Sequence, residues 1–176
     1  LAIGYKSSYI INYFKNNFLE NNINFFDDGD VDIIERIKSV IKEKPNEDVL
    51  ILYGDTISDV RIDELFLFSN NNKKHSILTV WPLKTNFGIV ELNEKQEITH
   101  FKEKPQLDKY INIGYFILRK KLFKYLDMHN TYADFLIFCG KNNLLKAFIH
   151  KGEHFTVNNV VELQLAEKNI SKIKIF

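Results

Sequence analysis

The sequence predicts an α/β fold built on a mixed, mainly parallel sheet with helices on both faces. Three observations support this prediction: a continuous apolar run at 49–53, helical patterns at 8–19 and 31–41 that alternate with strands, and a strand-rich second half. A continuous apolar run between turn formers is typical of a strand buried on both faces of a parallel sheet. Strands that alternate with helices through short loops indicate three layers with right-handed crossovers.

The elements of the first half follow from apolar spacing. Residues Leu1–Tyr5 are expected to form a buried strand, and Ser7 and Ser8 are placed to cap the helix that follows. In chain order, the predictions are a strand over 1–5, a helix over 8–19, a strand over 23–26, a helix over 31–41 that Pro45 ends, and a strand over 49–53. From Ser76 onward, strands are predicted over 77–82, 87–92, 98–102 and 111–118, with antiparallel pairing among them.

Composition and charge limit the class of protein. A chain of 176 residues with 45% hydrophobic residues can bury one core without disulfides, so we expect a single domain over 1–176. The 24 Lys and Arg balance 23 Asp and Glu to a net charge of +1 and are scattered, which argues against nucleic acid or a membrane as partner. The single cysteine, Cys139, lies in an apolar stretch, is expected to be a buried thiol, and favours a reducing cytoplasm.

The strongest local signal is the segment Leu52-Tyr53-Gly54-Asp55-Thr56. It presents Asp55 at the carboxyl end of a buried strand, where open α/β sheets bind their ligands. A carboxylate at this place suits a metal ion, but a capping Asp in a strand-to-helix turn explains it equally well. Spacing alone leaves both interpretations open.

Further motifs follow in a fixed order along the chain. They are Phe87-Gly88-Ile89-Val90, then Phe101-Lys102-Glu103-Lys104-Pro105, then Ile111-Asn112-Ile113-Gly114. With Gly54-Asp55 before them, this series resembles the sugar-1-phosphate nucleotidyltransferase family, and the match extends from Gly4 to about Glu167. The resemblance implies a Rossmann-like fold of the nucleotide-diphospho-sugar transferase type.

The resemblance also implies roles for individual residues. Lys104 would contact the substrate phosphate as a compact cation, and Glu103 would accept hydrogen bonds from substrate hydroxyls. Asn112 would hydrogen-bond the substrate, while Gly88 and Gly114 would let the backbone approach it closely. Without the surrounding motifs, Glu103 and Lys104 would be interpreted as a solvated charged turn.

Two positions are implied as magnesium ligands, Asp55 and Asn158. Many family members carry an Asp where this chain has Asn158, and the pattern Val157 to Glu167 is similar to the branch that makes UDP-N-acetylglucosamine, in which an Asn is the ligand. An amide oxygen is a hard, neutral ligand that Mg²⁺ accepts. The alternative is a weakened or silent site.

One family feature has no counterpart in this sequence. The glycine-rich loop with its Arg, and the Lys that follows, hold the triphosphate in the family. Because the sequence opens in a strand, we expect the natural protein to begin about 50 residues or more upstream of Leu1. Asp28-Gly29-Asp30 stands where the family often has a Gly pair near the base, which puts that contact in doubt.

The implied function is Mg²⁺-dependent nucleotidyl transfer, with Asp55 and Lys104 as the candidate catalytic residues. A phosphate oxygen of a phosphorylated metabolite, foremost a sugar 1-phosphate, attacks the α-phosphorus of CTP, UTP or GTP and expels pyrophosphate. The base, the acceptor and a homo-oligomeric state stay open. Three alternatives are a cytidylyltransferase acting on a non-sugar phosphate, a metal-dependent glycosyltransferase that uses Asp28-Gly29-Asp30 or Asp30-Val31-Asp32, and a non-catalytic paralogue that binds nucleotide sugars.

Overall fold

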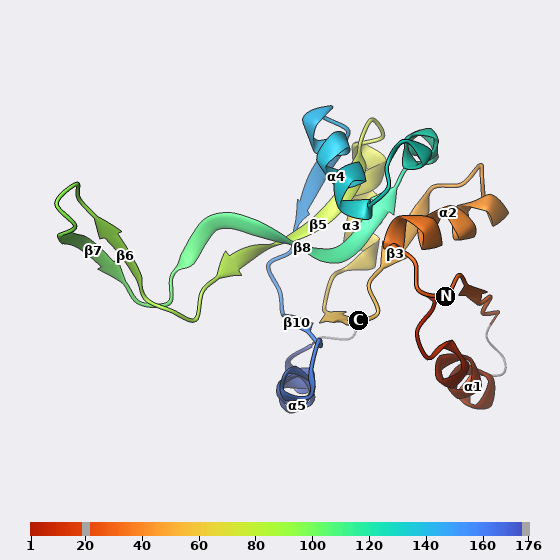
Figure 1. Ribbon diagram of the computed structural model, residues 1–176, viewed down its shortest axis with the longest axis horizontal. Helices are drawn as coiled ribbons and strands as arrows, with labels where there is room; N and C mark the ends of the chain where they lie inside the picture. Colours follow the sequence, from red (N-terminus) through yellow and green to blue (C-terminus); the bar gives the residue numbers. More distant parts are fainter. Residues whose placement is uncertain (19–21, 174–176) are drawn as a thin grey trace. The chain divides into compact units, whose positions relative to one another are not determined.

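The computed structural model, drawn in Figure 1, describes residues 1–18 and 22–173. The chain divides into two compact units. Unit 1 comprises Leu1–Val49 and Leu118–Leu145, and unit 2 comprises Leu50–Ile117 and Lys146–Phe176. Both contain strands and helices, and the ladders include parallel and antiparallel pairs. The predicted mixed α/β class is therefore confirmed.

Unit 1 is built from short strands and helices. Its elements are β1 (Ala2–Ile3), α1 (Ser7–Asn17), β2 (Phe26–Asp27), α2 (Ile33–Glu43), the 3₁₀ helix η1 (Lys120–Met128) and α4 (Tyr132–Lys141). Strands β1 and β2 pair in parallel. Asp32 caps α2, since its Oδ1 accepts from the backbone N–H of Ile34, and the same oxygen accepts from that of Tyr132, both at 2.9 Å. One carboxylate thus joins the starts of α2 and α4.

Two predictions for the start of the chain are wrong. Only Ile3 of the expected strand is buried, whereas Leu1 and Tyr5 are 48% and 79% exposed. Helix α1 begins at Ser7 after Lys6, whose φ is 57°, and no side chain caps it. A left-handed residue turns the chain into the helix here, so the hydroxyl caps are not used. Leu19, the predicted end of that helix, lies outside the described residues.

Unit 2 contains a four-stranded sheet in the order β3-β8-β5-β9. The elements of unit 2 are β3 (Val49–Leu52, its first residue at the boundary), β4 (Thr56–Ser58), α3 (Ile62–Asn71), β5 (Ser76–Lys84), β6 (Ile89–Leu92), β7 (Ile98–Lys102), β8 (Gln106–Leu118), β9 (Leu145–Ile149), β10 (His154–Thr156), α5 (Val160–Asn169) and the 3₁₀ helix η2 (Ile170–Lys172). The core of this unit consists of Val60, Leu65, Ile77, Ile113 and Ile117. Strands β5 and β8 supply most of this core and run outward from it together.

Antiparallel pairing is more extensive than the mainly parallel arrangement that the sequence suggested. Strands β5 and β8, β4 and β10, and β6 and β7 all pair antiparallel. The 13 residues of β8 run back along β5, which accounts for much of this pairing. The strand at 98–102 is confirmed as β7. By contrast, β3 is half-buried rather than buried on both faces, and Leu52 is 54% exposed.

Helix α4 carries the single cysteine. Cys139 is fully buried, as expected, and burial raises the pKa of its thiol to about 11.

Within the described ranges 1–18 and 22–173, none of the helices has the length and apolar character that crossing a membrane requires.

Candidate active site

The ladder between β4 and β10 brings Asp55 and Asn158 to the same end of two neighbouring strands. The pairs are Thr56 with Thr156, Ile57 with Phe155, and Ser58 with His154. Beyond the first pair, the backbone N–H of Val157 donates to the carbonyl of Asp55 at 2.8 Å. Asn158 follows directly, so residues that are about a hundred positions apart in sequence lie on adjoining backbone segments of unit 2.

Local hydrogen bonds fix the backbone at both positions. The N–H of Asn158 donates to Glu162 Oε2 at 2.7 Å, and the N–H of Glu162 donates to Asn159 Oδ1 at 2.9 Å. Asn159 is thus the N-cap of α5, and the Glu162 carboxylate holds the residue before the cap. The Asp55 carboxylate accepts from Thr56 Oγ1 at 3.3 Å. Both Asp55 and Asn158 are exposed.

A carboxylate and an amide oxygen are suitable donors for a hard divalent cation. In the described part of the chain, no cluster of three or more His, Cys, Asp or Glu residues could hold a metal ion. The metal-binding role of Asp55 and Asn158 at this junction of the two segments therefore stays a prediction, in which water and phosphate would supply the other ligands.

Tyr53 joins Asn112 and Gly114 of β8 to the segment that leads to Asp55. The backbone N–H of Tyr53 donates to the Gly114 carbonyl at 3.0 Å, and Asn112 Nδ2 donates to the Tyr53 hydroxyl at 3.4 Å. Gly114 has a φ of 77°, and a Cβ added there would lie 2.5 Å from Tyr53 Cγ. The structure thus gives Gly114 a packing role against Tyr53, while its predicted approach to substrate stays a prediction.

The remaining candidates flank the hairpin formed by β6 and β7: Gly88 lies just before β6, and Glu103 and Lys104 lie just after β7. A Cβ at Gly88 would lie 2.6 Å from the ring of Phe101 and 3.1 Å from Glu103 Oε2. Lys104 has a φ of 45°, and its Nζ lies 3.9 Å from Glu103 Oε1. The side chains of Glu103 and Lys104 are 63% and 64% exposed. The turn therefore presents one anion and one cation to solvent.

The candidates form two groups within unit 2. Asn112 pairs with Val80, whereas the hairpin begins after the pair of Lys84 with Gln106, four residues farther along β5. We call Gly88, Glu103 and Lys104 the hairpin group. At about 3.3 Å per residue, this group lies roughly 13 Å beyond Asn112 along the paired strands β5 and β8. Figure 1 shows the hairpin at the end of the long strands β5 and β8. Tyr53 connects Asn112 and Gly114 to the segment that leads to Asp55, and the bond from Val157 connects Asp55 to the segment that leads to Asn158. Gly88, Glu103 and Lys104 lie apart from these residues, at the hairpin.

Sequence reasoning missed His154, which lies on β10 next to this junction. Burial lowers the pKa of His154, and nearby His150 adds to this, whereas the charge of Asp55 acts in the opposite direction. Its Nε2 lies 3.2 Å from Thr156 Oγ1. The available signal was the spacing of two of the five histidines, at 150 and 154, just before Asn158.

Comparison with known proteins identifies the family. Residues 16–139 match the family model described as nucleotidyl transferase. The chain belongs to the nucleotidyl transferase family. Since this match covers more than half of the chain, it also confirms the resemblance on which the residue roles were based.

Relatives of this nucleotidyl transferase chain include the bifunctional protein GlmU of Methanocaldococcus jannaschii, 28% identical over 131 residues, or 72% of this chain and 30% of that protein. The glucose-1-phosphate adenylyltransferase of Bacillus licheniformis is 32% identical over 85 residues, which cover 46% of this chain and 22% of that enzyme. Among solved structures, HddC of Yersinia pseudotuberculosis aligns with a TM-score of 0.71 and 19% identity over 97% of this chain and 77% of its own. The chain thus spans less than a third of the length of these sequence relatives.

Proposed function

We propose that the whole protein carrying this chain is a nucleotidyltransferase that joins an NTP to a sugar 1-phosphate and releases pyrophosphate. One observation carries the proposal: the β4–β10 ladder continues into a backbone hydrogen bond from Val157 to Asp55, so the exposed residues Asp55 and Asn158 follow on adjoining backbone segments at one junction. Family membership supplies the reaction class for which such a junction is suited.

The metal at this junction is proposed to be Mg²⁺, held by Asp55 and Asn158. These residues fit the ion, because both offer hard oxygen donors and the residue before Asn158, Val157, is hydrogen-bonded to the backbone of Asp55. When bound, the ion neutralises the negative charge that builds up on the triphosphate. The Asp55 carboxylate supplies the only formal charge of this ligand pair.

The reaction needs no covalent enzyme intermediate. A phosphate oxygen of the acceptor forms a bond to the α-phosphorus of the NTP while the bond to the pyrophosphate oxygen breaks, so the enzyme contributes position and charge. We assign Lys104 to the acceptor phosphate and Glu103 to acceptor hydroxyls. Asn112 is assigned to substrate hydrogen bonding, and Gly88 and Gly114 to close backbone approach.

These assignments require the hairpin group to come within reach of the junction when substrate binds. Hairpin β6–β7 has few contacts with a core, since every one of its strand residues is exposed. A two-stranded hairpin of this kind is only marginally stable alone, so substrate binding can order and reposition it at low cost.

The name of one relative supports the acceptor class that we propose. One of them is named as a glucose-1-phosphate adenylyltransferase, which supports a hexose 1-phosphate as the acceptor. The identity of the NTP stays open among CTP, UTP and GTP. A cytoplasmic location is proposed because the single thiol, Cys139, is buried within α4 and unpaired.

The glycosyltransferase alternative is weakened by the local structure of the aspartates on which it depends. Asp32 caps α2 and also accepts from the N–H of Tyr132, so its carboxylate is already engaged in hydrogen bonds that support the fold. Asp27 accepts from the N–H of Gly29, and this turn shapes the segment 28–30. A structural role thus accounts for Asp32 of the Asp30-Val31-Asp32 motif.

Pyrophosphate release by the whole protein tests the proposal. The protein is incubated with Mg²⁺, each of the common NTPs and a panel of hexose 1-phosphates, with glycerol 3-phosphate as the non-sugar acceptor. We expect release that requires both an NTP and a sugar 1-phosphate. Release with the non-sugar phosphate alone would favour the cytidylyltransferase alternative, and a nucleoside diphosphate formed from a nucleotide sugar would favour a glycosyltransferase.

A further inference from the structure

A buried pair at the far end of the β4–β10 ladder, Asp59 and His150, is not used by the proposed chemistry. His150 Nε2 lies 3.0 Å from Asp59 Oδ1, and the two side chains retain only 8% and 11% of their exposed surface. The same Asp59 oxygen accepts from the backbone N–H of Glu153 at 2.8 Å. Asp59 therefore binds both ends of the turn that connects β9 to β10.

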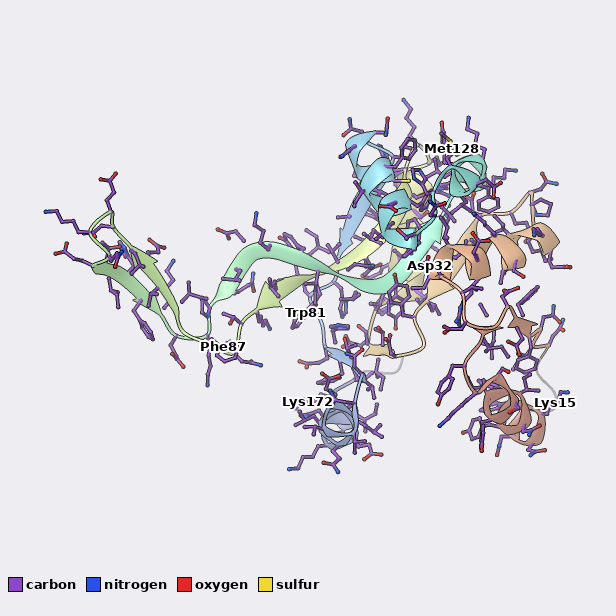
Figure 2. The ribbon with its side chains drawn as sticks, viewed as in Figure 1. Lys15, Asp32, Trp81, Phe87, Met128 and Lys172 are labelled. Carbon is purple, nitrogen blue, oxygen red and sulfur yellow. The ribbon has the colours of Figure 1, made fainter. Side chains whose placement is uncertain are left out.

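Further hydrogen bonds hold this turn in place. Trp81 Nε1 donates to the carbonyl of Gly152 at 3.0 Å, and Ser58 Oγ donates to that of Glu153 at 2.8 Å. Trp81 of β5 is labelled in Figure 2. A Cβ at Gly152 would collide with Asp59 Oδ1, so only glycine fits beside this carboxylate. We call Asp59, His150 and the turn residues Gly152 and Glu153 the β10 clamp.

The clamp lies at one end of a very short ladder, and the candidate metal ligands lie at the other. Strand β10 begins at His154, directly after the clamp, and makes three residue pairs with β4 before Val157 bonds to Asp55. Three pairs span roughly 10 Å. So short a ladder does little to fix its own register, and a slip of one residue would turn each side chain to the opposite face.

We propose that Asp59 and His150 are positioning residues that fix the register of β10 against β4 and thereby hold Asn158 beside Asp55. This inference rests on the proposed function of the same site. Asp59 acts through its contacts with the turn, and His150 acts by holding the same carboxylate oxygen that accepts from Glu153. Neither residue is assigned a contact with substrate or metal.

The first test measures metal binding without catalysis. Binding of Mn²⁺ alone to the whole protein is followed through the electron paramagnetic resonance signal of the free ion. The Asp55→Ala variant measures the Mn²⁺ that binds at other sites, and this amount is subtracted. We expect Asp59→Ala to weaken the Asp55-dependent binding about tenfold or more, the usual effect of losing support behind a metal ligand. Asp59→Asn, which keeps an oxygen for the Glu153 N–H, should weaken it less. Asp63→Ala removes an exposed carboxylate of α3 and should leave binding unchanged.

A double variant shows whether the effect passes through Asn158. If the clamp acts by placing Asn158, Asp59→Ala should weaken Mn²⁺ binding much less in an Asn158→Ala background than in the parent. Equal effects in both backgrounds would overturn the inference, as would a fall in thermal stability with unchanged Mn²⁺ affinity. Absence of any Asp55-dependent binding in the parent protein would overturn it too. Asp55-dependent binding without pyrophosphate release would instead count against the proposed function and leave the positioning result intact.

Discussion

At the scale of single residues, the candidate site combines side chains that are fixed with side chains that are free to meet a ligand. The Asn112 amide is engaged on both sides, by the N–H of Gly114 at 2.9 Å and by the Tyr53 hydroxyl. Asp55 and Asn158 are exposed, although the backbone that carries them is hydrogen-bonded. This division is consistent with the proposed site, in which a preorganised scaffold would present the oxygens of Asp55 and Asn158 to a metal ion.

Substitutions at the two metal positions should have unequal effects. Asp55→Ala removes the only charged ligand and should lower kcat/KM by roughly 10²-fold or more, about 2.7 kcal/mol of transition-state stabilisation. Asn158→Asp should keep substantial activity because it retains an oxygen, whereas Asn158→Ala should not. Steady-state kinetics over a range of Mg²⁺ concentrations make the comparison, with thermal unfolding as the control. Parental rates and Mg²⁺ dependence in Asn158→Ala would show that Asn158 is not a ligand.

Lys104 should contribute more to the binding of the sugar 1-phosphate than to the binding of the NTP. Lys104→Ala is expected to raise the KM for the sugar 1-phosphate more than that for the NTP, because its charge is assigned to the acceptor phosphate. The expected cost is about 1–3 kcal/mol, the scale of a hydrogen bond to a charged group. Lys95→Ala, at the tip of the same hairpin, serves as the matched control. Equal changes in both KM values would contradict the assignment.

At the scale of elements, the path of β8 past Tyr53 depends on a residue without a side chain. Gly114→Ala would force a Cβ into the Tyr53 ring at a φ of 77°. The left-handed backbone alone costs about 1–2 kcal/mol for a residue with a Cβ, so the free energy of unfolding should fall by at least that amount. Gly54→Ala is the control, because a Cβ there meets nothing within 4 Å. Denaturant unfolding measures both variants, and equal stabilities would contradict the packing argument.

The start of β3 is joined to η1 through Asp48. Its carboxylate lies 2.7 Å from Arg119 Nη1 and accepts from the N–H of Lys120 at 2.9 Å. Burial acts to raise the pKa of Asp48, but these hydrogen bonds and the two positive charges outweigh it, so the pKa lies below its ordinary value. A depressed pKa stabilises the folded state above the unfolded-state value of about 3.9, and this contribution is lost as the pH falls through the folded-state pKa.

Asp48→Asn should therefore flatten the acid side of the stability profile. Urea unfolding between about pH 6 and pH 2 should show the parent losing more stability than the variant below roughly pH 4. Glu47→Gln, which removes the neighbouring exposed carboxylate, should leave the profile close to that of the parent. Parallel profiles for the parent and Asp48→Asn would contradict a depressed pKa in the folded state.

The helices and strands that could be predicted are those whose type is determined by the residues within the element itself. The apolar run at β3, the apolar spacing of α2 and the alternation in β7 each contain their signal within a few residues. Their burial could not be predicted in the same way, because it depends on distant partners. Leu52 belongs to a continuous apolar run and is still more than half exposed.

At the scale of the whole molecule, some features of the candidate site depend on residues close in sequence, and others depend on residues far apart. The position of Asp55 after a strand could be predicted from its neighbours, whereas its meeting with Asn158 depends on the β4–β10 ladder. The contact of Asp59 with Glu153 joins residues 94 positions apart, and no local sequence pattern predicts it. Sequence reasoning named Asp55 and Asn158 as candidate ligands and missed the contacts of the β10 clamp.

Exchange of radiolabelled pyrophosphate into NTP tests nucleotidyl transfer most directly. The whole protein is given Mg²⁺, labelled pyrophosphate and a nucleotide sugar, and the label is followed into NTP. Direct displacement predicts exchange that requires the nucleotide sugar and is lost in Asp55→Ala. A mixture of NTP and labelled pyrophosphate without any sugar substrate should show no exchange. Exchange in that mixture, or no exchange in the complete one while the nucleotide sugar is cleaved to a nucleoside diphosphate, would contradict the proposed reaction.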